Sequence, residues 1–285
     1  MFLGTRSIHN RREFLLRSSA LSLCGLFPAL LGGQSSVSQE GDDARLAAIP
    51  RDTLLKFNPD GTPRQFAGNT VICHLPQQCQ VWEAVAGLGN ALRSSSFAHK
   101  LGVLPSDSYH VSILDGLNDQ DRARYGWPSD IPIDTPIKEC NRIIGDRIAQ
   151  FRMRAQLPIL FRLDEEKTLA PQRASGLQLA PVDANEKLKL NMLRDRMAAE
   201  VYRYRADDHE TFGFHISMAY QIRGFTVAER REYQGLLTQH LPAIVGAAPV
   251  IELGDPEFCT FDDMYRFEIR KLLRTSSKCR AVGKG

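Results

Sequence analysis

The chain has 285 residues, and its 36 basic and 33 acidic side chains give a formal net charge of +3 at pH 7. Four of the basic residues and one acidic residue fall within the first 33 positions, which leaves 32 of each sign in the rest of the chain. Proteins that hold long RNA or DNA by its backbone normally carry a basic excess. The even balance therefore argues against a long nucleic acid as ligand and favours a small substrate.

The first 33 residues have the pattern of an export signal. Arg11 and Arg12 are followed by Phe14, close to the twin-arginine pattern, and an apolar stretch over 18–31 comes next. That stretch is shorter than the ~20 apolar residues that usually span a bilayer. We therefore expect residues 1–33 to be a twin-arginine signal peptide, the export machinery to be a partner, and the protein to be periplasmic or secreted. Whether the signal is cleaved stays open.

The composition of the rest of the chain predicts one large unit. Residues 34–55 are expected to be a linker, because Ser, Gln, Gly and Asp are frequent there. Residues 56–275 are long enough to bury a full core, and they are expected to form two strand–helix–strand groups, one ending near 160 and the other near 270. Residues 276–285 are left as a tail.

Cysteine usage indicates neither a zinc site nor a dense disulfide framework. Beyond the signal the chain has five cysteines, an odd number, and no Cys-x-x-Cys pair. Cys73 lies in an apolar run that is expected to form a strand, which favours a buried thiol over a disulfide to Cys79.

Hydrophobic periodicity predicts strands alternating with amphipathic helices. The expected strands are 69–75, 109–114, 157–163, 176–181, 212–220, 249–253 and 261–270. The expected helices are 80–92, 136–154, 185–204 and 227–241. Asp183 and Thr226 are suitable N-caps for the last two helices, and Glu229 completes a capping box with Thr226.

Two short segments of the chain echo each other. Tyr-His-Val-Ser over 109–112 and Phe-His-Ile-Ser over 214–217 both lie in apolar runs. Side chains two apart in a strand leave the same face, so each strand presents one imidazole and one hydroxyl together. A site that joins the two strands would hold two groups for proton transfer and two hydroxyls for phosphoryl oxygens.

These paired motifs, His110 to Ser112 and His215 to Ser217, resemble those of the two-histidine phosphoesterase superfamily, which includes LigT-like proteins and RNA 2′,3′-cyclic phosphodiesterases. A strand over 68–75 that precedes a helix adds to the resemblance, which covers about 56–275 and suggests a divergent exported bacterial branch. The resemblance implies a bilobal α+β fold in which two antiparallel sheets flank a central cleft, with the helices outside.

The same resemblance implies a phosphodiesterase that needs no metal or cofactor. One of His110 and His215 would be the base and the other the acid, in an order that the sequence leaves open, and Ser112 and Ser217 would bind the non-bridging phosphate oxygens. The expected substrate is a small nucleotide or a short RNA end with a 2′,3′-cyclic phosphate. We expect a monomer that forms no stable complex with nucleic acid.

Weaker expectations concern residues around the motifs. Tyr220 and Arg223, at the end of the second motif strand, are candidates for binding a base and a phosphate. His74 is placed to reach the cleft from a neighbouring strand. The segment 115–134, with Tyr125 and Trp127, is the best candidate for a loop that contacts substrate, and His209 is expected in a solvated loop.

Two other functions stay open. One is a periplasmic nucleotide- or phosphate-binding protein that has the same fold but does not turn over its ligand. The other is a hydrolase that uses Ser112 or Ser217 as nucleophile. It is disfavoured because a His and a Ser two apart on one strand lie about 6–7 Å apart, beyond hydrogen-bond reach.

Overall fold

The computed structural model describes residues 49, 51–122, 126–170 and 175–274. The predicted signal peptide, most of the predicted linker and the tail over 276–285 lie outside these residues, as does Tyr125. The end of the predicted linker is helical, because helix α2 spans Arg51–Lys56. None of the helices in the described part of the chain is long and apolar enough to cross a membrane.

Within the described residues, nine strands form one antiparallel sheet. Their order is β7-β4-β5-β6-β3-β1-β8-β9, with β2 paired to β6. The strands are β1 Gly68–His74, β2 Leu101–Val103, β3 His110–Asn118, β4 Ile159–Leu163, β5 Ser175–Pro181, β6 His215–Gln221, β7 Ile251–Leu253, β8 Glu257–Phe261 and β9 Glu268–Leu272.

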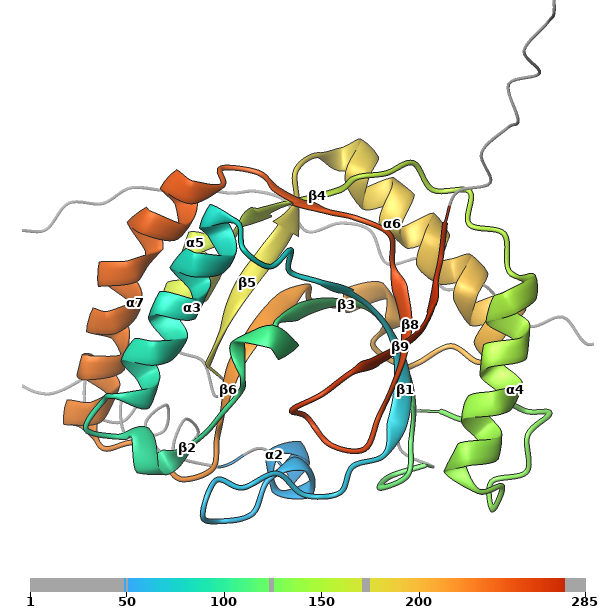
Figure 1. Cartoon of the computed structure of the whole chain (residues 1–285), viewed down its shortest axis with the longest axis horizontal. Coiled ribbons are helices and arrows are strands. Elements are labelled where there is room, and N and C mark those ends of the chain that lie inside the picture. Colours follow the sequence, from blue (N-terminus) through green and yellow to red (C-terminus); the bar gives the residue numbers. More distant parts are fainter. Residues whose placement is uncertain (1–48, 50, 123–125, 171–174, 275–285) are drawn as a thin grey trace, which may run out of the picture.

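The sheet is curled, and its concave side is open (Figure 1). The α+β class is therefore confirmed, but the predicted division into two sheets is not, since the strands form a single hydrogen-bonded path. The path is narrowest between β3 and β6, which are joined through the pair Val111 and Ile216. Both histidine motifs thus come to this one junction.

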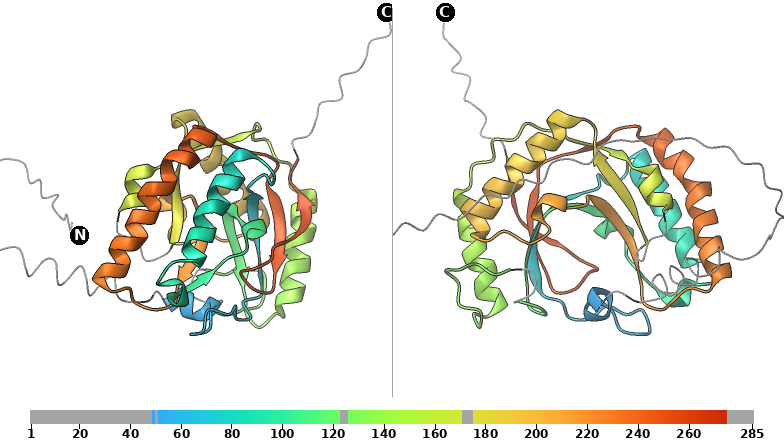
Figure 2. Two further views of the ribbon diagram at one scale, coloured as in Figure 1. Left: turned by 60° about the vertical axis from the view of Figure 1, so that its left-hand side comes forward. Right: turned by 180° about the vertical axis from the view of Figure 1, so that it is seen from behind.

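The helices cover the outside of the curled sheet. Figure 2 shows α3 and α7 packed side by side. Helices α4 and α6 lie over a different part of the sheet. The longer helices are α3 Gln80–Arg93, α4 Ile137–Gln150, α6 Ala184–Arg196 and α7 Val227–Ala247, and α5 Glu165–Leu169 is a short helix. Shorter turns are Ala98–Lys100, Ser106–Ser108 and His209–Thr211, and α6 continues into a π-helical turn over Met197–Tyr202.

The predicted helix starts are confirmed in atomic detail. The Asp183 side chain accepts a hydrogen bond from the backbone N–H of Glu186 at the start of α6. At the start of α7, Thr226 and Glu229 each accept a hydrogen bond from the other's backbone N–H. Each cap satisfies N–H groups that have no partner within the helix, which stabilises the helix by about 0.5–2 kcal/mol.

One predicted strand is wrong. The run over 261–270 is not continuous, because β8 ends at Phe261 and β9 begins at Glu268. Asp262 and Asp263 turn the chain between them, and the Asp263 carboxylate accepts from the backbone N–H of Tyr265. Strand β2 was not predicted, since three residues that include Gly102 give no period.

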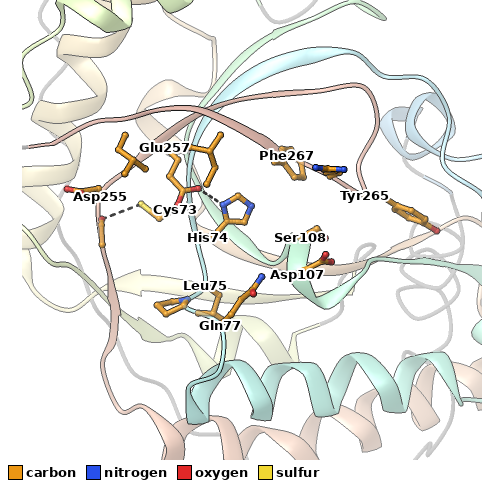
Figure 3. A pocket seen from close by; sticks show the side chains of 15 residues that line it. Cys73, His74, Leu75, Gln77, Asp107, Ser108, Asp255, Glu257, Tyr265 and Phe267 are labelled. Carbon is orange, nitrogen blue, oxygen red and sulfur yellow. Dashed lines mark hydrogen bonds and ion pairs between the residues drawn. The ribbon is translucent and has the colours of Figure 1, made fainter.

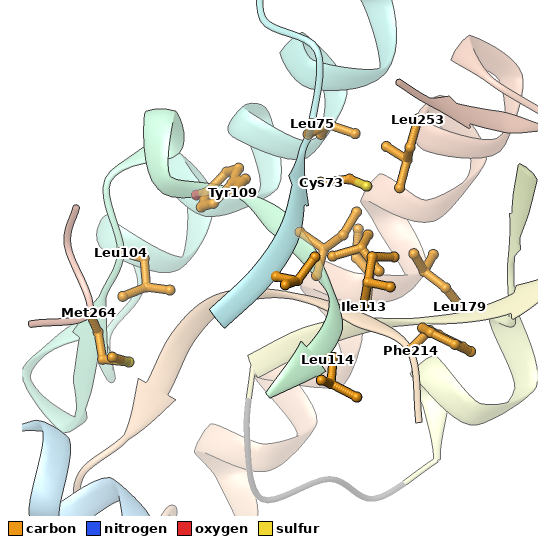
Figure 4. Close-up of a cluster of buried hydrophobic side chains, with 14 of the residues drawn as sticks. Cys73, Leu75, Leu104, Tyr109, Ile113, Leu114, Leu179, Phe214, Leu253 and Met264 are labelled. Carbon is orange, nitrogen blue, oxygen red and sulfur yellow. The ribbon is translucent and has the colours of Figure 1, made fainter. Parts of the chain in front are cut away.

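Apolar side chains fill the space between the sheet and the helices. Figure 4 shows part of this core, where Ile113, Leu179 and Leu253 pack together. Burying such a side chain fully stabilises the fold by about 1.5–3 kcal/mol. Cys73 is a buried free thiol, as expected. Because the apolar side of β1, β3 and β6 faces the helices, the opposite side of these strands is left for polar residues.

Candidate active site

The junction of β3 and β6 brings the two motifs into one cavity. Val111 pairs with Ile216 in antiparallel register. His110 therefore lies opposite Ser217 and Ser112 opposite His215, on the face away from the two paired apolar residues. All four side chains line one cavity of about 280 Å³ on the concave side. His110 and His215 are diagonal neighbours across the two strands, and the Cα atoms of such neighbours lie roughly 7–8 Å apart.

A β-bulge adds a carboxylate to the same cavity. Val71 of β1 pairs with Leu114, but the next residue, Ile72, pairs with Ser112, so Ile113 is an extra residue in β3. A bulge reverses the alternation of side chains along the strand that contains it. Asp115 is thereby turned to the side of His110 and Ser112, and it lines the cavity with them.

Backbone carbonyls fix the orientation of both imidazoles. Nδ1 of His110 lies 2.7 Å from the carbonyl oxygen of Ser108, and Nδ1 of His215 lies 2.9 Å from that of Gly213. A carbonyl oxygen can only accept, so each Nδ1 carries a proton and donates it. Each Nε2 is therefore the atom left to take or give a proton.

Burial keeps His110 uncharged. Loss of solvent lowers the pKa of His110 to about 3, while the hydrogen bond to Ser108 opposes the shift and the nearby charges of His74, His215 and Lys56 add to it. Phe267 covers the imidazole, with its ring centre 4.4 Å from that of His110. At neutral pH His110 is therefore in the neutral form that a general base needs, with a free lone pair on Nε2, but its low pKa makes it a weak base in this state of the site.

Lys56, the last residue of α2, also lines the cavity and is a residue that sequence reasoning missed. Its ammonium nitrogen lies 5.3 Å from the ring centre of Phe66 and 5.1 Å from that of Tyr220. The next residue, Phe57, packs on Gly102, where a Cβ would lie 2.4 Å from a ring carbon. This close approach requires glycine and holds the end of α2 against the sheet.

The surroundings of Lys56 keep it charged. Burial opposes the charge, but the Tyr220 hydroxyl and the carboxylates of Asp115 and Asp52 outweigh it and raise the pKa of the ammonium group above its usual value. No sequence pattern could have indicated this residue, because its neighbours come from α2, β3 and β6. A cation held this way is suited to bind a phosphate oxygen.

The two predicted substrate-binding residues, Tyr220 and Arg223, differ in their position relative to the cavity. Tyr220 lines the cavity and packs on Phe57, with ring centres 5.0 Å apart. Arg223 is exposed, donates a hydrogen bond to the carbonyl oxygen of Pro59 at 3.0 Å, and is not among the residues that line the cavity. The structure thus brings Tyr220 to the motifs and leaves Arg223 outside.

Most of the segment 115–134 lies away from the cavity. Only Asp115, Gly116 and Asn118, all within β3, line it among the described residues of this segment. Trp127 instead donates a hydrogen bond from its indole N–H to the carbonyl oxygen of Ile131. The tryptophan thus packs on its own loop. This contact fits a surface loop and not a loop that binds substrate.

The buried His209 does not fit a solvated loop. Its Nε2 lies 2.9 Å from a carboxylate oxygen of Asp195, and its carbonyl oxygen accepts a hydrogen bond from Arg194. These contacts give His209 a structural role, since they fix the chain that leads into β6. The adjacent Asp208, from the same acidic run, does line the cavity.

His74 lies next to His110 but opens onto a different cavity. The two residues are directly paired across β1 and β3, with ring centres 6.1 Å apart. His74 forms an ion pair with Glu257, and both line a neighbouring cavity of about 550 Å³ (Figure 3). Phe267 lines both cavities, so its ring separates His110 from this second space.

One group of described side chains could hold a metal ion. Ligand atoms of His74, Glu257 and Cys259 lie within 4.8 Å of one another. Burial and the adjacent Glu257 raise the pKa of the Cys259 thiol, so the sulfur keeps its proton and is a poor ligand in this state. The side chains of His74 and Glu257 already bind each other.

The sequence and fold were compared with known proteins. A family model named 2H-phosphodiest, described as a domain of unknown function (DUF1868), matches residues 56–171, which include the first motif but not the second. The crystal structure of the conserved protein of unknown function ATU0111 from Agrobacterium tumefaciens str. C58 is similar, with a TM-score of 0.73 and 27% identity over 82% of this chain and 99% of that chain. No curated protein matches. The predicted resemblance to two-histidine phosphoesterases is confirmed.

Proposed function

We propose that this chain, a two-histidine phosphoesterase-like protein, is a phosphodiesterase that hydrolyses a cyclic or small nucleotide phosphodiester of the 2′,3′-cyclic phosphate type. One observation carries the proposal: a single cavity holds His110 and His215, each with Nδ1 bound to a carbonyl, together with Ser112 and Ser217. The match to the family model independently supports phosphodiesterase-type activity.

His110 is assigned as the base because it is neutral at pH 7 and its Nδ1–H donates to the carbonyl oxygen of Ser108, which leaves the lone pair on Nε2 free. A water oxygen attacks phosphorus while Nε2 of His110 takes a proton from that water. The bond between phosphorus and the ribose oxygen breaks, and Nε2–H of His215 gives its proton to that oxygen. The product is a phosphomonoester beside a free hydroxyl, and a second proton exchange with solvent restores both imidazoles.

The remaining polar groups stabilise the charge that builds on the phosphoryl oxygens. The hydroxyls of Ser112 and Ser217 lie on the same face as the histidines and donate hydrogen bonds to these oxygens. The ammonium of Lys56 supplies the positive charge. The ring of Tyr220 offers a flat surface for a nucleobase. In this scheme the acid, the base and the charge stabilisation all come from side chains, so no metal ion or cofactor takes part.

The place of action rests on the sequence alone. Arg11, Arg12 and the apolar stretch over 18–31 support export by the twin-arginine pathway, so we place the protein in the periplasm or outside the cell. On this proposal the catalytic unit is 56–275, with two lobes over 56–165 and 166–275, and it acts as a monomer without a stable nucleic-acid complex.

Hydrolysis of adenosine 2′,3′-cyclic phosphate by the purified protein, followed by ³¹P NMR between pH 5 and pH 9, tests the proposal. We expect a phosphomonoester at a rate that added chelator does not change. Binding of the nucleotide without turnover would show a non-catalytic binding protein instead. A rate abolished by chelator and restored by a divalent ion would contradict the acid–base scheme.

A further inference from the structure

We propose that the cavity selects a phosphodiester whose single negative charge is carried on an otherwise uncharged group with hydroxyl or amino donors, and that it rejects substrates with a second phosphate. This inference rests on the proposed function, because it names the substrate class of the same site. The inference distinguishes a free cyclic nucleotide from the phosphorylated or extended end of an RNA. The charge balance of the whole chain does not distinguish these two substrates.

In the part of the cavity that the structure describes, one lysine provides positive charge for a phosphate. Among the described residues that line it, Lys56 is the sole lysine or arginine. Its ammonium nitrogen lies over two aromatic rings, 5.3 Å from the centre of Phe66 and 5.1 Å from the centre of Tyr220. The motif histidines and serines lie in the same cavity. A diester that reacts between the histidines therefore uses the charge of Lys56 and the proton of His215, which leaves no lysine or arginine among the described lining residues for a second phosphate.

Three carboxylates line the rest of the same cavity. Asp52 comes from α2, Asp115 from the bulged strand β3 and Asp208 from the segment before β6. Arg194, a buried cation, donates hydrogen bonds to the carbonyl oxygens of Ile113 and His209 and is not among the lining residues. A second phosphate would thus meet negative charge without a cation of its own.

The same carboxylates suit uncharged donors. An ionised carboxylate only accepts hydrogen bonds, so Asp115 and Asp208 can bind sugar hydroxyls or the exocyclic amine of a base. The aromatic rings of Tyr220, Phe261 and Phe267 line the cavity and can cover a flat group. A volume of about 280 Å³ is at the small end for ligand sites, so the cavity itself holds a group of about the size of one mononucleoside.

Three probes that share one reacting group test the inference. They are adenosine 2′,3′-cyclic phosphate, the same compound with a 5′-phosphate, and the dinucleotide ApA with a terminal 2′,3′-cyclic phosphate. The 5′-phosphate adds roughly 1.5–2 negative charges at pH 7. We expect kcat/KM for the unmodified nucleotide to exceed that for each of the others by roughly ten- to hundredfold at low salt, with the gap narrowing as salt is raised.

Charge-removing variants show whether the carboxylates cause the preference. Asp115→Asn and Asp208→Asn keep the side-chain shape, and each should reduce the preference against the 5′-phosphate by about three- to tenfold. Asp146→Asn, on the exposed face of α4 and outside the cavity, is the matched control and should leave the preference unchanged.

The outcomes separate this inference from the proposed function. If none of the three probes is hydrolysed, the phosphodiesterase proposal fails. If all are hydrolysed and the 5′-phosphorylated nucleotide or the dinucleotide reacts as fast as the unmodified one, the phosphodiesterase proposal survives and the selectivity inference is overturned. A preference that persists unchanged in both aspartate variants would also overturn it, because the carboxylates would then not be its cause.

Discussion

Phe267 should determine the pH range in which His110 can act as a base. Its ring covers the imidazole at 4.4 Å between ring centres and separates it from the adjacent cavity of about 550 Å³. Phe267→Ala would open His110 to that cavity and to water. Since burial is the largest cause of the low pKa of His110, hydration should raise this pKa toward the ordinary value of about 6.5.

The size of the effect follows from the fraction of neutral His110. With a pKa of about 3, the imidazole is almost fully neutral at both pH 5 and pH 7, so this group gives no loss of kcat/KM between them. If the variant's pKa reaches about 5, kcat/KM at pH 5 falls about twofold relative to pH 7. If it reaches about 6.5, the fall is about 25-fold.

Initial rates with adenosine 2′,3′-cyclic phosphate across pH 4–8 measure the acid limb of the pH–rate profile, which is the fall in kcat/KM at low pH. Circular dichroism at each pH shows whether the variant stays folded, and Ile269→Ala, an exposed change on the neighbouring strand β9, is the control. An acid limb that stays at the wild-type position in a folded Phe267→Ala protein would refute the argument that this ring keeps water from the base.

Three further outcomes are expected. Lys56→Met keeps the stem that packs on the aromatic rings but removes the charge, and it should lower kcat/KM about 10- to 100-fold, mainly through kcat; unchanged kinetics would remove Lys56 from the phosphate site. Ser112→Ala and Ser217→Ala should each lower kcat by roughly 10- to 10³-fold without loss of fold, as measured by steady-state rates and thermal unfolding. Replacing Arg11 and Arg12 by lysine should keep the protein in the cytoplasm in a fractionation assay, and unaffected export would argue against a twin-arginine signal.

The sequence predicted those parts of the site that depend on local patterns. The two motifs lie on strands and share a face because the alternation of side chains is a property of each strand by itself. The N-caps at Asp183 and Thr226 were likewise predictable, since a cap needs only a few consecutive residues. Each of these features can be read within ten residues of the chain.

Other parts of the site depend on contacts between distant segments. Asp115 enters the cavity only because Ile113 is an extra residue in β3, and a bulge is defined by the pairing with β1 rather than by β3 alone. Lys56 is positioned by rings on two other segments. Arg223 was expected at the site from its position after the motif strand, but its side chain bonds to Pro59 instead.

The sequence did not indicate that the two expected sheets are one hydrogen-bonded sheet. Strands of the first half of the chain pair with strands of the second half at β1 and β8 and at β2 and β6, as well as at the short junction of β3 and β6. A single paired position at a junction leaves no mark on the periodicity of either strand.

The central claim is that His110 and His215 act as base and acid in one step. The most direct measurement is kcat for adenosine 2′,3′-cyclic phosphate with His110→Ala, His215→Ala and the double variant, beside His99→Ala as an exposed control. We predict a loss of about 10²–10⁴-fold for each single change, and a double variant that loses far less than the product of the two. A folded single variant with wild-type kcat, or losses that multiply in the double variant, would contradict the claim.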